Sequence, residues 1–255
     1  MWCISCHFQF RYLKNKQRST QCERMFHGKM EITYYGHSCF ILEIAGKKLL
    51  FDPFIRGNEF AKDIAIDQIE ADYILVSHGH SDHTADLVYL ANKTGALVIA
   101  SWEITTWLEK QEIKNVHPMN VGGKRSFPFG NLQMTFAAHS SSFSDGSYAG
   151  VAAGFLISFE GKTVYYSGDT GLSLEMKLIG ELNKIDLALM PIGGNFTMDA
   201  GDAALASNFI NCKRVIGLHY DTFGYIVIDH ESSIAFFKNK GVELVLLKSG
   251  EKFTI

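Results

Sequence analysis

The chain has 255 residues, of which 47% are hydrophobic and 20% charged, with a formal net charge of −3. This length suits one large domain or two small ones, and the composition is that of a soluble globular protein. The charge balance excludes a broadly basic surface for nucleic acid, and no apolar run reaches the length of a membrane span, about 18 residues. Because we find no secretory signal, we expect a cytoplasmic protein.

Residues 1–29 mix aromatic and basic side chains without a clear period. We interpret them as an N-terminal extension that is disordered or follows from a misassigned start, with translation beginning at Met25 or Met30. Two weaker alternatives concern cofactors. Cys3-Ile4-Ser5-Cys6-His7 has the spacing of c-type haem attachment, which requires export, and zinc would find four ligands in Cys3, Cys6, Cys22 and His27. The five cysteines make no disulfide framework, and we expect Cys39 and Cys212 in the core.

From residue 30 onward, strand patterns alternate with helix patterns. A meander of three strands ends at Asp52-Pro53, since proline cannot donate to a ladder. The first half contains strands at 31–35, 39–44, 48–51, 73–76 and 96–100 and helices at 82–92 and 104–110. The second half contains hairpins at 126–136 and 154–166, helices at 174–182, 203–210 and 232–239, and strands at 187–190, 215–218, 243–247 and 252–255. Hairpins followed by strand–helix units predict two sheets packed face to face in a single α/β domain, residues 30–255.

The run Ser77-His78-Gly79-His80-Ser81-Asp82-His83 directly follows an apolar strand pattern. Imidazole and carboxylate ligands together suit zinc and its first-row neighbours. His78 and His80 can point the same way, while Asp82 and His83 lie one turn further on. A polar surface loop is the alternative, but this density of histidine in a chain with only ten favours metal. One short segment is therefore predicted to serve two adjacent metal positions.

Four more polar residues stand at predicted strand ends, namely Asp52, His139, Asp169 and His219. Singly, each is typical of a hydrogen-bonded rim histidine, a turn or a helix cap. Strand ends can also direct side chains into a shared cleft. Together with the histidine cluster, His139, Asp169 and His219 give five histidines and two aspartates, enough for two cations.

The pattern His78-x-His80-x-Asp82-His83, followed by His139, Asp169 and His219, resembles the metallo-β-lactamase superfamily over residues 30–255. The resemblance implies an αβ/βα sandwich of two mixed β-sheets with helices on the outer faces and the site at one edge. It implies a first metal held by His78, His80 and His139. A second metal would be held by Asp82, His83 and His219, with Asp169 bridging the two. Asp52 matches a structural aspartate that steadies the histidine loop.

Three further motifs resemble a narrower group, the small metal-dependent hydrolases related to ascorbate-6-phosphate lactonase. These motifs are Gly36-His37-Ser38-Cys39-Phe40, Ser167-Gly168-Asp169-Thr170 and Asn195-Phe196-Thr197-Met198. We see no inserted nuclease-type domain, which argues against RNA processing.

Two cations would share a water, lower its pKa towards neutrality and leave a bridging hydroxide as nucleophile. We expect Asp82 to orient this hydroxide as well as to bind metal. His37 follows the first strand, and we hypothesise that it lies at the cleft rim and contacts the substrate or protonates the leaving group. The alternative is that His37 is a hydrogen-bonded histidine of the turn, without a role in catalysis.

The sequence therefore predicts a dinuclear metal-dependent hydrolase that acts on a small-molecule lactone, ester or phosphodiester. The alternatives are a phospholipid or cyclic-nucleotide phosphodiesterase and a non-catalytic metal-bound sensor or scaffold. We expect two divalent ions, zinc first, although the ligand types also permit manganese, iron, nickel or cobalt. A homo-oligomer is left open, and no nucleic-acid partner is expected.

Overall fold

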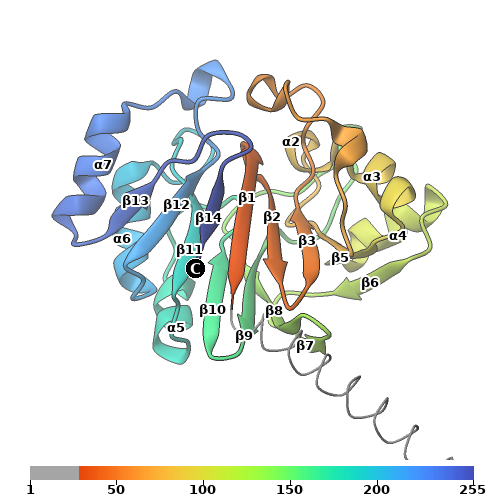
Figure 1. The fold of residues 1–255 in the computed structure, drawn as a ribbon, viewed down its shortest axis with the longest axis horizontal. Coiled ribbons are helices and arrows are strands. Elements are labelled where there is room, and N and C mark those ends of the chain that lie inside the picture. Colours follow the sequence, from red (N-terminus) through yellow and green to blue (C-terminus); the bar gives the residue numbers. More distant parts are fainter. Residues whose placement is uncertain (1–28) are drawn as a thin grey trace, which may run out of the picture.

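The computed structural model describes residues 29–255. Two seven-stranded mixed β-sheets pack face to face, and helices cover their outer faces (Figure 1). The predicted αβ/βα sandwich is therefore confirmed. The proposed N-terminal extension, with its haem and zinc patterns, lies outside the described residues apart from Lys29. Within the described part of the chain, the helices are too short or too polar to cross a membrane.

The first sheet has the strand order β14-β1-β2-β3-β4-β5-β6. Neighbours are antiparallel from β14 to β3 and parallel from β3 to β6. Its strands are β1 (Met30–Gly36), β2 (Cys39–Ile44), β3 (Lys47–Phe51), β4 (Tyr73–Leu75), β5 (Leu97–Ser101), β6 (Val116–Met119) and β14 (Lys252–Thr254). Strand β6 was not predicted, because Pro118 argues against a strand. Its place at the sheet edge explains why proline is tolerated there.

The second sheet has the order β13-β12-β11-β10-β9-β8-β7. Its strands are β7 (Lys124–Phe127), β8 (Gly130–Phe136), β9 (Ala153–Phe159), β10 (Lys162–Tyr166), β11 (Leu187–Pro191), β12 (Arg214–Leu218) and β13 (Glu243–Val245). Both predicted hairpins pair as expected, β7 with β8 and β9 with β10. The parallel strands β10 to β13 then receive the crossover helices α5 (Glu175–Leu182), α6 (Ala200–Phe209) and α7 (His230–Asn239).

Three apolar layers hold the sandwich together. The inner layer lies between the sheets, where Phe40 stacks on Phe51 at 4.4 Å and Tyr166 of the other sheet meets both rings edge-on. One outer layer packs α3 (Leu87–Thr94) and α4 (Trp102–Lys110) on the first sheet, and the other packs α5 to α7 on the second. Cys39 and Cys212 are buried in the outer layers as free thiols, as predicted.

The single helix predicted for residues 82–92 is wrong. The chain forms a short α2 (Ser81–Thr84) and a separate α3, and Asp86 stands between them outside helical geometry. The reason is a buried contact: the Asp86 carboxylate accepts from the backbone N–H groups of Ile55 and Arg56 at 2.7 and 2.8 Å. These bonds fasten the loop that follows β3 to the start of α3.

Candidate metal centre

Loops from both sheets bring all seven predicted metal-facing residues to one end of the sandwich. His78 and His80 follow β4, Asp82 and His83 lie in α2, and the second sheet contributes His139 after β8, Asp169 after β10 and His219 after β12. Asp169 lies between the others. Its Oδ2 is 2.9 Å from His219 Nε2, 3.2 Å from His83 Nε2 and 4.0 Å from His139 Nε2.

The first group comprises His78, His80 and His139, whose ligand atoms all lie within 4.8 Å of one another. His78 Nε2 is 2.9 Å from His80 Nδ1. The Ser77 hydroxyl donates to Asp52 and so accepts from His78 Nδ1, 2.9 Å away. With its proton on Nδ1, His78 directs the Nε2 lone pair into the group, which is the arrangement that a metal-binding imidazole needs.

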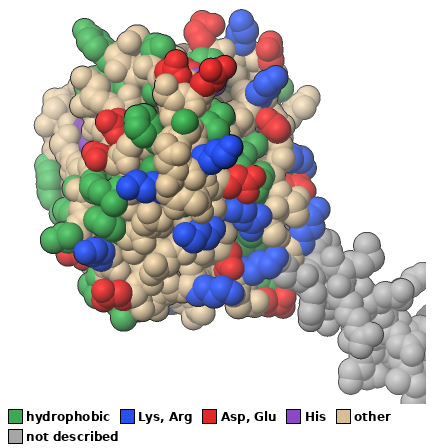
Figure 2. All heavy atoms as spheres, turned by 90° about the vertical axis from the view of Figure 1, so that its left-hand side faces the viewer, with side chains coloured by type: hydrophobic (Ala, Val, Ile, Leu, Met, Phe, Trp, Pro, Cys, Tyr) green, Lys and Arg blue, Asp and Glu red, His purple; other side chains and the backbone are tan. Residues whose placement is uncertain are grey.

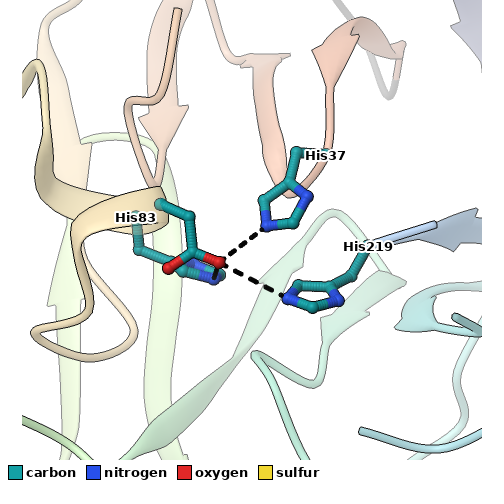
Figure 3. A group of neighbouring side chains, drawn as sticks. His37, His83 and His219 are labelled. Carbon is teal, nitrogen blue, oxygen red and sulfur yellow. Dashed lines mark hydrogen bonds and ion pairs between the residues drawn. The ribbon is translucent and has the colours of Figure 1, made fainter. Parts of the chain in front are cut away.

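The second group comprises His37, Asp82, His83 and His219, again within 4.8 Å. Asp82 Oδ2 is 3.0 Å from His37 Nε2, 3.6 Å from His219 Nε2 and 3.9 Å from His83 Nε2. Figure 3 shows the three imidazoles converging on one carboxylate oxygen. The group thus contains the three residues that the resemblance implies for the second metal, and His37 besides.

Asp52 holds the histidine loop through hydrogen bonds from the protein interior. Its buried carboxylate accepts from the Ser77 backbone N–H at 2.7 Å, from the Tyr166 hydroxyl, and from His83 Nδ1 at 2.8 Å. The predicted contact between Asp52 and the histidine loop is therefore confirmed. Because His83 Nδ1 donates to Asp52, its Nε2 faces Asp82 and Asp169. A carboxylate that fixes a metal-facing imidazole in this way is the common second layer of metal sites.

The polar groups left without partners fit a cation. Asp169 Oδ1 is buried and has no hydrogen-bond partner among the described residues. An unpaired buried acceptor costs about 1–3 kcal/mol, more if it is charged, unless a cation satisfies it. His83 Nε2 lies 3.2 Å from Asp169 Oδ2, and His78 Nε2 faces His80 Nδ1. The donor set of imidazole nitrogens and carboxylate oxygens therefore fits divalent metal ions.

The electrostatics of the two groups differ. Burial holds the pKa of His78 well below its usual value and also lowers the pKa values of His80 and His139, so the first group consists of neutral imidazoles. In the second group burial opposes charging, but the Asp169 carboxylate and its hydrogen bond raise the pKa of His219 to about 9. The pKa of Asp169 is held well below its ordinary value, against burial, by His219 and His83. The centre thus has a side of neutral imidazoles and a side where imidazoles are paired with the carboxylates of Asp82 and Asp169.

His37 does not lie at the rim, and that prediction is wrong. Its side chain is fully buried, with Nε2 facing Asp82 and Nδ1 3.0 Å from Thr222 Oγ1. Burial lowers the pKa of His37 to about 4, so the ring is neutral near pH 7. Its carbonyl oxygen accepts from the His219 backbone N–H at 3.0 Å. Thr222 was missed by sequence reasoning, since no motif marks a contact across 185 positions.

Two loops contact the centre. Ser141, in the loop after β8, accepts from the Gly79 N–H at 3.2 Å and so holds the histidine loop. Ser140 Oγ lies 3.4 Å from His80 Nε2. In the loop after β11, Met198 is buried and its N–H donates to the Thr170 carbonyl at 2.9 Å, next to Asp169. Phe196 of the same loop is half exposed.

A family model described as the β-lactamase superfamily domain matches residues 31–219. The chain belongs to the metallo-β-lactamase superfamily. Within it, the chain is 49% identical to a UPF0173 metal-dependent hydrolase of Methylacidiphilum infernorum and 48% identical to one of Flavobacterium johnsoniae. Each alignment covers 226 residues, 89% of this chain and 100% of the relative. The protein is therefore a metal-dependent hydrolase of this superfamily.

Solved structures agree with this assignment. A metallo hydrolase from the hyperthermophilic archaeon Ignicoccus hospitalis superposes with a TM-score of 0.81 at 33% identity, over 89% of this chain and 98% of that one. An isothiocyanate hydrolase from Delia radicum gut bacteria has a TM-score of 0.72 at 17% identity, over 88% and 98% of the two chains. The second likeness concerns the fold alone.

Proposed function

We propose that the protein is a dinuclear metal hydrolase that cleaves a lactone, ester or phosphodiester bond in a small molecule. The observation that supports two ions is the division of the donors into two groups, with Asp169 Oδ2 within 4.0 Å of a histidine from each. In this proposal the first ion is held by His78, His80 and His139. The second is held by Asp82, His83 and His219, and Asp169 lies between them.

In this proposal His37 helps to hold the second metal ion and does not contact the substrate. The Thr222 hydroxyl donates to the Tyr220 carbonyl at 3.2 Å, so it accepts from His37 Nδ1. The lone pair on His37 Nε2 then faces Asp82, where two acceptors oppose each other unless a cation lies beside them. We therefore replace the proposed leaving-group role of His37 with a role in holding Asp82 and the second ion.

Two divalent ions bound there would supply an activated water as nucleophile and would polarise the carbonyl or phosphoryl oxygen. The protein's own residues prepare that chemistry. Asp52 fixes His83 in one tautomer, Ser77 does the same for His78, and the buried position of both excludes bulk water from behind the ligands. Asp82, 23% exposed, is the carboxylate placed to orient a water or accept its proton.

Zinc remains the first choice of metal, because the first group offers three imidazoles and no carboxylate. Manganese, iron, nickel and cobalt are the other candidates. We also retain residues 30–255 as the catalytic unit and the cytoplasm as its location.

Metal analysis tests the proposal. We expect about two ions per chain in protein purified without chelators, about one in the His139→Ala variant, and about two in His117→Ala, which changes a half-buried histidine outside both groups. Elemental analysis gives these ratios directly. The dinuclear scheme fails if the parent protein holds at most one ion, or if His139→Ala keeps both. Ester, lactone and phosphodiester probes then test hydrolysis.

A further inference from the structure

Five loops border the two metal-facing groups, and we call them the rim loops: residues 52–58, 137–152, 167–174, 192–199 and 219–229. Two of them contain a group member, His139 or His219, and a third contains Asp169, which lies between the groups. The loop at 52–58 begins with Asp52, which contacts His83. The loop at 192–199 is tied to residue 170 by the bond from the Met198 N–H.

The rim loops offer almost no positive charge. They contain no lysine and a single arginine, Arg56. Its Nε lies 2.6 Å from the buried Asp86 carboxylate, and its guanidinium lies over the Tyr89 ring. The same loops contain three exposed aspartates, Asp145, Asp199 and Asp229. A substrate with its own phosphate or carboxylate would therefore meet carboxylates and no free cation on these loops.

The rim loops that lack free cations carry exposed aromatic side chains. Phe196 is 52% exposed and Tyr225 78% exposed, although they come from different rim loops, and their rings meet edge-on at 6.2 Å. Phe223, also exposed, has its ring 5.3 Å from that of His37 in the second metal-facing group. We call Phe196, Phe223 and Tyr225 the aromatic wall. Because exposed rings of this size are costly to hydrate, they indicate a surface that binds apolar groups.

The wider surface shows the same separation. On the face formed by α5, α6 and α7, hydrophobic side chains gather towards one side, while most lysine and arginine side chains lie on the other (Figure 2). Among the exposed apolar residues, Leu174, Phe196, Tyr225 and Val227 come from rim loops.

We infer that the substrate is an uncharged ester or lactone with an alkyl or aryl group beside the bond that is cleaved, and that the aromatic wall binds this group. The inference rests on the proposed hydrolase function and chooses among its substrates. One water is consumed: the acyl carbon forms a bond to the water oxygen, its bond to the alcohol oxygen breaks, and one proton ends on the alcohol. The metal ions would neutralise a phosphoryl group at the cleaved bond, but the rim loops offer no free lysine or arginine for further negative charge, so an uncharged substrate is favoured.

Three chromogenic probes test the inference: p-nitrophenyl acetate, p-nitrophenyl hexanoate and the anionic bis(p-nitrophenyl) phosphate. We expect the metal-loaded protein to prefer hexanoate to acetate and either ester to the phosphodiester, judged by kcat/KM. The double variant Phe196→Ala/Tyr225→Ala should reduce the hexanoate-to-acetate ratio about tenfold while its metal content stays unchanged. Leu182→Ala, which removes another exposed apolar side chain, from the end of α5, should leave the ratio as it was.

The inference is overturned if the double variant keeps the parent ratio, or if the parent protein prefers the phosphodiester. It is also overturned if the double variant changes only the oligomeric state in size-exclusion chromatography, because the wall would then be a contact between copies. If no probe is hydrolysed, the proposed function fails, and the wall is tested by binding alone. NMR titration with phenylacetamide should then show weaker binding to the double variant, and equal binding would contradict the inference.

Discussion

At the scale of single residues, Asp52 shows how a side chain that binds no metal can govern a metal site. Its carboxylate collects bonds from Ser77, His83 and Tyr166 in the interior. Only the bond to His83 fixes a metal-facing imidazole directly. Replacing the carboxylate with an amide keeps the shape but removes the charge, and one donor of the amide must then face another donor.

We therefore expect Asp52→Asn to weaken metal binding about 10–100-fold, as outer partners of ligating histidines usually do. Competition with a chromogenic chelator measures the affinity. Asp72→Asn is the matched control, because Asp72 also accepts a backbone and a side-chain bond, from the Lys48 N–H and the Lys47 ammonium. Asp72 stands directly before β4, whereas the histidine loop follows β4. Equal affinities for the two variants would show that Asp52 acts only on stability.

The sequence was sufficient to predict that the seven candidate ligands lie close together, because they follow strands that end at the same edge. It was not sufficient for His37. Its place depends on backbone contact with His219 and on the Thr222 hydroxyl, both more than 180 positions away. Neither contact leaves a periodic or spaced pattern in the chain, so only the folded structure reveals them.

At the scale of elements, the break between α2 and α3 is stabilised by Asp86. We expect Asp86→Ala to lower the free energy of unfolding by about 2–4 kcal/mol, since it leaves the N–H groups of Ile55 and Arg56 without their acceptor in a buried place. Urea denaturation measures the loss. Arg56→Ala removes only the exposed ion-pair partner of Asp86, so its effect should be much smaller. Similar losses for both variants would mean that the ion pair, and not the bonds from the backbone N–H groups, accounts for the stabilisation by Asp86.

Gly168, just before Asp169, provides a second test at this scale. Its φ is +62°, and an added Cβ would stand 2.2 Å from the Ala153 carbonyl oxygen. Gly146 has a φ of +81° but open space around it. We expect Gly146→Ala to cost about 1 kcal/mol for the backbone strain alone, and Gly168→Ala about 3 kcal/mol or more because strain and clash combine. Thermal unfolding of both variants gives the difference, and equal losses would show that the clash is relieved.

The elements themselves followed well from the sequence where one pattern dominated. The hairpins and the parallel strands β10 to β12 were predictable from alternation, turns and apolar runs. The helix break at Asp86 was not, because residues 82–92 form a continuous helical pattern and the competing bonds come from a loop about 30 positions earlier. Strand β6 was missed because its proline is tolerated only at the sheet edge, and edges are set by the whole fold.

At the scale of the whole molecule, the candidate ligands come from both sheets. The first sheet supplies His78, His80, Asp82 and His83, and the second supplies His139, Asp169 and His219. Bound ions would then connect the two halves of the sandwich, and binding to the folded state alone raises its stability by mass action.

We expect chelation to lower Tm and added metal to restore it, with Tm rising as the free metal concentration rises. Differential scanning calorimetry at several buffered metal concentrations measures the change. The double variant His78→Ala/His139→Ala should respond less, because one site is lost. If the Tm of the parent protein changes with neither chelator nor metal, the idea that metal ions connect the two sheets is contradicted.

The loop at 192–199 bears on how substrate preference can change in evolution. It supplies Phe196 to the aromatic wall but none of the seven predicted metal-facing residues, and it is tied to the site through the backbone bond of Met198. Mutations at its exposed tip can therefore alter which molecules are accepted while the inherited metal centre stays intact. Within one superfamily, enzymes with the same centre can in this way diverge towards different substrates by small, separately tolerated steps.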